Sequence, residues 1–119
     1  MPGPPPGYHA VTPRIVVDDV AAQVAFLRTV FGAAGDVHPG RPAEVRIGDS
    51  LILVSGPDAR DRFPAFLYVY VDDADETYVR AVSAGAVTLE APLDTPYGDR
   101  RAMVRDAWGN VWQIAHRRA

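Results

Sequence analysis

An internal repeat is the feature that most constrains the fold of this 119-residue chain. The string VVDD at residues 16–19 is echoed by YVDD at residues 70–73, 54 positions later. After each string comes a helix-like stretch that ends near a glycine, Gly32 in the first copy and Gly85 in the second. Strand-like runs around a tight turn complete each copy. Matched landmarks in the same order predict two similar modules.

Each module is predicted to run strand, helix and then further strands, because the apolar residues first alternate, then recur every three to four positions, and then alternate again. The expected strands and helices cover residues 11–17, 20–31, 43–47 and 50–54 in the first module, and residues 66–71, 74–84, 87–89, 99–105 and 111–115 in the second. The aspartate pairs at 18–19 and 72–73 stand where helices begin, so we expect them to cap helices and not to act as acid–base pairs. We predict an α+β fold in which two βαβββ modules form a half-barrel sheet with the helices on its outer face.

Length and composition narrow the protein class further. Residues 1–7 hold four prolines and two glycines and are expected to be a flexible tail, with a single domain over 8–119 whose modules span about 8–57 and 64–117. The absence of cysteine excludes a disulfide framework and a thiol nucleophile. The net charge of −3 argues against nucleic-acid binding, and no apolar run reaches the roughly 20 residues of a membrane helix. Since the chain starts without a signal-peptide pattern, a cytoplasmic location is expected.

Several short strings occur in a characteristic order: TP at 12–13 before VVDD, RIGDS at 46–50, VYVDD at 69–73, YGDR at 97–100, and VRD followed by GNVW within 104–112. With these strings the chain resembles the glyoxalase/bleomycin-resistance/extradiol-dioxygenase superfamily, and within it the bleomycin-resistance-like branch. The resemblance covers nearly the whole chain after the tail. It implies paired βαβββ modules, a homodimer and, in the metal enzymes of the family, a divalent ion held in the half-barrel.

The resemblance places the metal-ligand positions of those enzymes at Thr12, Ile52, Phe66 and Gln113. Isoleucine and phenylalanine have no lone pair to donate, and threonine and glutamine are weak, uncharged ligands. We therefore predict no metal and no cofactor.

The three histidines do not replace these ligands. His9 and His116 lie an odd number of residues from Thr12 and Gln113, so strand alternation puts them on the opposite face, and both are expected at the surface. His38 lies in a loop-like stretch, where it is either an ordinary loop residue or part of a ligand groove.

The strand at 66–71 separates two kinds of side chain. Alternation puts Phe66, Tyr68 and Tyr70 on the inward face and the aliphatic residues between them toward the helices. Thr12 and Arg14 share the inward face of the first strand. Such an aromatic, partly polar surface suits a flat organic ligand, since rings stack and phenols and guanidinium groups orient polar atoms. The alternative is that these rings fill the half-barrel or a subunit interface.

Four further residues near the second hairpin have expected positions. Tyr97 is expected at the edge of a lid, Trp108 over the cavity or at a subunit contact, and Met103 in the groove, between two arginines on its face. Trp112 is expected in the core on the helix side.

These expectations combine into one functional hypothesis. The chain is predicted to be a metal-free homodimer that sequesters a bulky aromatic small molecule, with an antibiotic, and hence drug resistance, as the candidate. The predicted ligand-binding residues are Thr12, Arg14, His38, Phe66, Tyr68, Tyr70, Tyr97, Met103, Trp108 and Gln113. The alternatives are a metal-dependent lyase, isomerase or dioxygenase of the same superfamily, a metal-free enzyme that uses Arg14 and a tyrosine, and a scaffold without a small ligand.

Overall fold

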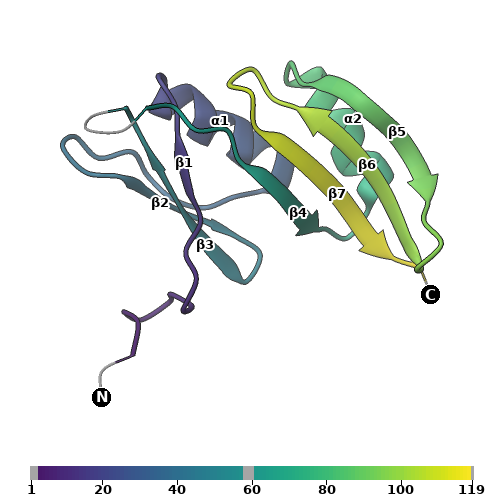
Figure 1. The fold of residues 1–119 in the computed structure, drawn as a ribbon, viewed down its shortest axis with the longest axis horizontal. Helices are drawn as coiled ribbons and strands as arrows, with labels where there is room; N and C mark the ends of the chain where they lie inside the picture. The colour runs from purple at the N-terminus through teal and green to yellow at the C-terminus, as the bar shows by residue number, and fades with distance from the viewer. Residues whose placement is uncertain (1–2, 58–60, 119) are drawn as a thin grey trace. The chain divides into compact units, whose positions relative to one another are not determined.

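The two copies of the repeat form two separate sheets in the computed structural model, which describes residues 3–57 and 61–118 (Figure 1). The first unit ends at Phe63 and the second begins at Pro64, except that Thr29–Phe31, the last turn of the first helix, belongs to the second unit. The molecule is α+β, with two helices that pack on two mixed sheets, as predicted. The closure of the sheets into a half-barrel stays a prediction.

The first unit is built on a three-stranded sheet. Its elements are β1 (Arg14–Val16), α1 (Val20–Phe31), β2 (Ala43–Ile47) and β3 (Ser50–Ser55). The central strand β3 pairs with β1 in parallel and with β2 in antiparallel orientation. Strand β1 is shorter than the predicted strand at 11–17, because Pro13 interrupts the run and cannot donate a ladder hydrogen bond.

The prediction of three strands after the helix is wrong for the first unit. Between α1 and β2 the described residues form no further strand but two isolated bridges, Ala34 with Arg46 and His38 with Arg41. The stretch GDVHPGRP at 35–42 explains this difference, since its prolines lack N–H groups and its glycines disfavour extended backbone. Gly35 also lies so close to the carbonyl oxygen of Glu44 that a side chain there would clash with backbone.

The second unit follows the predicted βαβββ order. Its elements are β4 (Phe66–Tyr70), α2 (Ala74–Ser83), β5 (Val87–Asp94), β6 (Asp99–Arg105) and β7 (Val111–Arg117). The strand order is β4-β7-β6-β5, with β4 parallel to β7 and the other pairs antiparallel. Strand β5 extends well beyond the predicted 87–89, through two shifts of register against β6.

The predicted caps are confirmed. The backbone N–H of Ala22 donates to Asp19 Oδ1 over 3.0 Å, and that of Glu76 donates to Asp73 Oδ1 over 3.1 Å. In both pairs, therefore, the second aspartate satisfies an N–H group that the first helical turn leaves unpaired.

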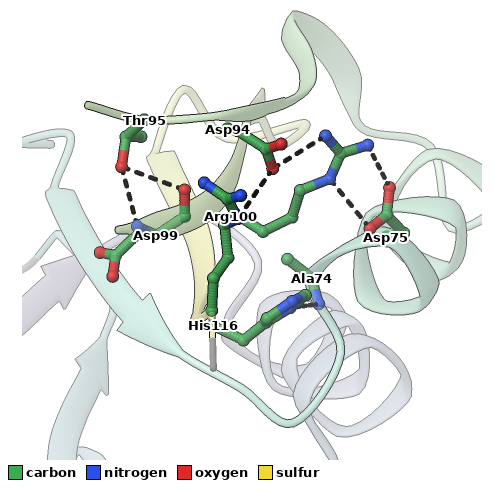
Figure 2. Close-up of polar contacts among 8 residues, drawn as sticks. Ala74, Asp75, Asp94, Thr95, Asp99, Arg100 and His116 are labelled. Atoms are coloured by element: carbon green, nitrogen blue, oxygen red, sulfur yellow. Dashed lines mark hydrogen bonds and ion pairs between the residues drawn. The ribbon is translucent and has the colours of Figure 1, made fainter. Parts of the chain in front are cut away.

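One face of the second sheet carries α2 and the core. Trp112 is fully buried there, and its ring centroid lies 5.3 Å from that of Phe31, which confirms its predicted place on the helix side. Two polar contacts join α2 to the sheet, as Figure 2 shows: Arg100 forms a salt bridge with Asp75 (3.0 Å), and Ala74 N–H donates to His116 Nδ1 over 2.7 Å. Arg100 also forms a salt bridge with Asp94 of β5 over 3.3 Å.

The contact of His116 corrects the prediction that this residue is a surface histidine. Its ring lies half-buried at the start of α2, because β7 continues to Arg117 and alternation turns His116 toward the helix. His9, in contrast, is exposed as predicted. None of the helices in the described part of the chain is both long and apolar enough to cross a membrane.

Candidate functional site

The face of the second sheet that points away from α2 collects aromatic and charged side chains. Alternation along β4 places Phe66, Tyr68 and Tyr70 there, and the Cα partners of the last two on β7 are Gln113 and Ala115. We call this surface the tyrosine face; it comprises Phe66, Tyr68, Tyr70, Tyr97, Asp99, Arg101, Met103, Gln113 and Arg117. Phe66 and Tyr70 are 67% and 58% exposed.

Asp99 organises this face. Its side chain is completely buried, and Oδ2 accepts hydrogen bonds from the hydroxyls of Tyr68 (2.6 Å) and Tyr70 (2.8 Å). Its other oxygen accepts from Arg117 Nη1 over 2.7 Å. Thr95 fixes the backbone, because its Oγ1 accepts from Asp99 N–H (2.9 Å) and donates to Asp99 O (3.0 Å), as Figure 2 shows.

The phenols reach Asp99 across a whole strand. Asp99 lies on β6 and the tyrosines lie on β4, so β7 separates them by about 10 Å of sheet. The β7 partner of Tyr70 is Ala115, whose small side chain leaves room for the phenol to pass over it. The rings of Tyr68 and Tyr70 meet at a tilt of 53°, with centroids 5.3 Å apart.

The hydrogen bonds fix the protonation states of the cluster. Hydrogen bonds from both phenols and from Arg117 lower the pKa of Asp99, although burial opposes the shift. Burial and the hydrogen bond to Asp99 raise the pKa of Tyr68 far above 10, and mainly the hydrogen bond to Asp99 raises the pKa of Tyr70. At neutral pH the cluster therefore holds a carboxylate that only accepts and two phenols that donate to it.

These protonation states determine which hydroxyl donates in the hydrogen bond between Tyr68 and Tyr97. The hydroxyls of Tyr68 and Tyr97 lie 3.5 Å apart. Since Tyr68 donates its only proton to Asp99, Tyr97 is the donor in this pair. Arg101 Nη1 in turn donates to the Tyr97 hydroxyl over 2.8 Å, and Arg101 is held by Glu90 over 2.8 Å. The rings are thus fixed by polar contacts at the hydroxyl ends.

The predicted ligand-binding residues fall into different groups. The six in the second sheet and its β5–β6 loop share the tyrosine face: Phe66, Tyr68, Tyr70, Tyr97, Met103 and Gln113. Trp108 lies outside it, half-buried in the β6–β7 turn, with its backbone N–H bonded to Asp106 Oδ1 over 3.0 Å. Thr12, Arg14 and His38 belong to the first unit.

The sequence reasoning missed Asp99, Arg117 and Glu90. The signal for the first two was present, because Asp99 lies four residues before Met103 and Arg117 lies four residues after Gln113. Even spacing along a strand places side chains on one face. Glu90 could not be found in this way, since β5 shifts its register on both sides of it.

The residues at the family's metal positions do not fit a divalent ion. Ile52 is buried and pairs with buried Val45, so its side chain faces the core; the residue on the open side of β3, opposite Arg14, is Leu53. The register that places Ile52 inward is therefore wrong by one residue, and Leu53 offers no lone pair either. Within residues 3–57 and 61–118 no cluster of three or more histidine, aspartate or glutamate side chains has a metal-binding arrangement. Function without a metal stays a prediction.

The first unit contains a pocket of about 530 Å³. It brings together two of the predicted residues, Arg14 and His38, and adds Arg41 and Ser55, which the sequence reasoning did not single out. Thr12 is not among the residues that line it. We call it the cationic pocket.

Comparison with known proteins identifies the family. The family model of the glyoxalase/bleomycin resistance protein/dioxygenase superfamily matches residues 8–114. The chain belongs to this superfamily. Among its relatives, uncharacterized proteins of Mycobacterium bovis and Mycobacterium tuberculosis are each 29% identical over 124 residues, which cover 88% of this chain and 81% and 72% of the relatives.

Solved structures show the same fold. TioX from Micromonospora sp. ML1 matches with a TM-score of 0.75 and 24% identity, over 92% of this chain and 96% of TioX. A lactoylglutathione lyase from Agrobacterium tumefaciens matches with a TM-score of 0.70 and 24% identity, over 95% of this chain and 96% of the lyase. Membership of the bleomycin-resistance-like branch stays a prediction.

Proposed function

We propose that this protein binds a bulky aromatic small molecule on the tyrosine face and sequesters it unchanged, without a metal, with an antibiotic as the candidate ligand. One observation carries the proposal: the rings of Phe66 and Tyr70 are exposed on one face while the phenol ends of Tyr68 and Tyr70 are tied to buried Asp99. Rings held in place lose little conformational entropy when a ligand stacks on them, so more of the contact energy appears as affinity.

The expected energies are sufficient for binding. Burying about 300 Å² of apolar ligand surface yields roughly 7 kcal/mol, and each aromatic pair adds about 0.5–1.5 kcal/mol. The loss of translational and rotational freedom offsets a large part of this gain, so micromolar affinity requires several stacked rings and polar contacts together. The tyrosine face supplies both, with Gln113 and the guanidinium groups of Arg101 and Arg117 beside the rings.

Fluorescence titration tests the proposal. Trp112 lies on β7 directly before Gln113, so a planar antibiotic that binds the tyrosine face is expected to change tryptophan emission. Phe66→Ala is expected to weaken binding about tenfold, through the loss of one stacked ring worth about 1.4 kcal/mol. The matched control is Phe63→Ala, which removes a similarly exposed ring (74%, against 67% for Phe66) from the first unit and should leave the affinity unchanged. No saturable change across a chemically varied panel would contradict the proposal.

The second candidate is a metal-dependent lyase, isomerase or dioxygenase. Superfamily membership and the structural likeness to a lactoylglutathione lyase favour it. Elemental analysis of the purified protein separates the two. Iron, manganese, nickel or zinc at one ion per chain, lost in Gln113→Ala, would favour the enzyme; only trace metal, unchanged by that substitution, supports the binding protein.

A further inference from the structure

The cationic pocket in the first unit has a defined frame. Arg14 opens strand β1, and parallel pairing with β3 puts Val16 opposite Ser55, so Arg14 and Ser55 lie on the same face of the sheet. A wall formed by Val20 at the start of α1 and by Val37 completes the frame beside them.

The second arginine of the pocket is placed by a tight turn. His38 and Arg41 form an isolated antiparallel bridge across Pro39 and Gly40, and Gly40 has a φ of 77°, which favours glycine. Side chains directly opposite each other in such a bridge lie close together on the same side. The turn therefore presents an imidazole and a guanidinium to the pocket together.

The charges in this pocket are unbalanced. Its lining residues include Arg14, Arg41 and His38 but no aspartate or glutamate among the residues that the structure describes. Seven other arginines each pair with a carboxylate: Arg28, Arg62, Arg80, Arg100, Arg101, Arg117 and Arg118. Arg46 and Arg105, like the two arginines of the pocket, form no ion pair with a described carboxylate, but neither of them lines the pocket. No such ion pair reaches Arg14 or Arg41 from residues 3–57 or 61–118.

Two guanidinium groups that line one pocket and form no ion pair with a described carboxylate are suited to an oxyanion. A guanidinium presents parallel N–H donors that match the oxygens of a carboxylate or phosphate, and the charge-assisted bonds are about twice as strong as neutral ones. The Ser55 hydroxyl adds a donor, while Val20 and Val37 offer an apolar wall to the rest of the molecule.

We propose that the cationic pocket binds the oxyanion of a small organic acid or phosphate ester. The site lies entirely within the first unit and shares no residue with the tyrosine face. It adds a second binding site to the proposed function and does not depend on it.

Nuclear magnetic resonance titration tests this proposal with two probes, sodium phosphate and sodium acetate, at constant ionic strength set with sodium chloride. The backbone amide signals of His38, Gly40, Arg41 and Gly56 are expected to shift saturably with a dissociation constant in the millimolar range, about −4 kcal/mol. Tighter binding of phosphate assigns a phosphate ester, and tighter binding of acetate assigns a carboxylate.

Variants make the result specific. Arg14→Gln and Arg41→Gln are each expected to weaken anion binding about tenfold. Arg14→Lys keeps the positive charge but loses the paired N–H donors of the guanidinium, so its affinity should lie between those of the wild type and Arg14→Gln. Arg105→Gln is the matched control, because Arg105 is also exposed but lies on β6 in the second unit. Non-saturating shifts that chloride reproduces, or anion binding in Arg14→Gln and Arg41→Gln as tight as in the wild type, would overturn the proposal. Unchanged phosphate binding in Phe66→Ala separates this site from the tyrosine face.

Discussion

A single buried carboxylate holds together the side chains on which the proposed ligand site depends. In Asp99→Asn one amide replaces a charged acceptor that serves two phenols and Arg117, and an amide cannot accept all three hydrogen bonds equally well. We expect a lower melting temperature and weaker binding of a planar ligand. Asp94→Asn is the control, since Asp94 is half exposed and its salt bridges to Arg100 and Arg118 are worth little. Equal effects of both substitutions would show that Asp99 does not organise the face.

The same residue predicts a dependence on pH. The pKa of Asp99 in the folded protein is lowered from the ordinary 3.8 by the two phenols and Arg117. A lowered pKa means that the carboxylate stabilises the fold at all pH values above 3.8, and that this contribution is lost as the pH falls through the folded-state value. The free energy of unfolding of the wild type should thus exceed that of Asp99→Asn at pH 7, and the difference should shrink below pH 3.8. Urea unfolding at pH 7, 4 and 3 measures it; a difference that grows on acidification would contradict the assignment.

At the scale of the element, the two aspartates before α1 can be compared directly, because they are neighbours in the sequence but make different contacts. Asp19 caps the helix through Ala22 N–H, whereas Asp18 forms a surface salt bridge with Arg62 over 2.7 Å. Asp19→Ala should lower the free energy of unfolding by about 1 kcal/mol, and Asp18→Ala by less than about 0.5 kcal/mol. Urea unfolding of the two variants measures these losses. A larger loss of stability in Asp18→Ala than in Asp19→Ala would mean that the cap does not stabilise the helix.

The β6–β7 turn depends on another buried aspartate. Asp106 accepts hydrogen bonds from the backbone of Trp108 and Asn110 and from Trp112 Nε1 (2.9 Å). Asp106→Ala leaves these buried donors without that acceptor and should cost about 2–4 kcal/mol of stability. Asp49, the aspartate of the β2–β3 turn, is exposed, and Asp49→Ala should cost less than about 0.5 kcal/mol. Similar losses in both variants, compared by urea unfolding, would contradict this account.

At the scale of the whole molecule, the family resemblance predicts a homodimer. Light scattering on the eluted protein should give twice the 12.9 kDa of one chain. Phe66→Ala should leave that mass unchanged, because the proposed function assigns the ring to a ligand and not to a subunit contact. A monomeric mass for Phe66→Ala would instead favour the alternative, in which the aromatic face packs against a second subunit.

Several features were determined by the sequence because they depend on local rules. The N-caps follow from the free N–H groups of a first helical turn, and the aromatic face follows from alternation within five residues of β4. Trp112 could be placed in the core by the same alternation. Other expectations failed: the position that the family resemblance gives Ile52 is one residue out of phase, and the loop at 35–42 forms a bridge between His38 and Arg41 instead of a strand.

Only the tertiary structure decided which side chains meet. Asp99 is 31 residues from Tyr68 and 29 from Tyr70, and they come together because β7 is inserted between β4 and β6 with a small alanine on its open face. The cationic pocket likewise joins β1, the 38–41 turn and the end of β3. Strand order and the direction of pairing arise from contacts across the whole chain, so periodicity along the sequence predicts the face on which a residue lies but not its neighbour across the sheet.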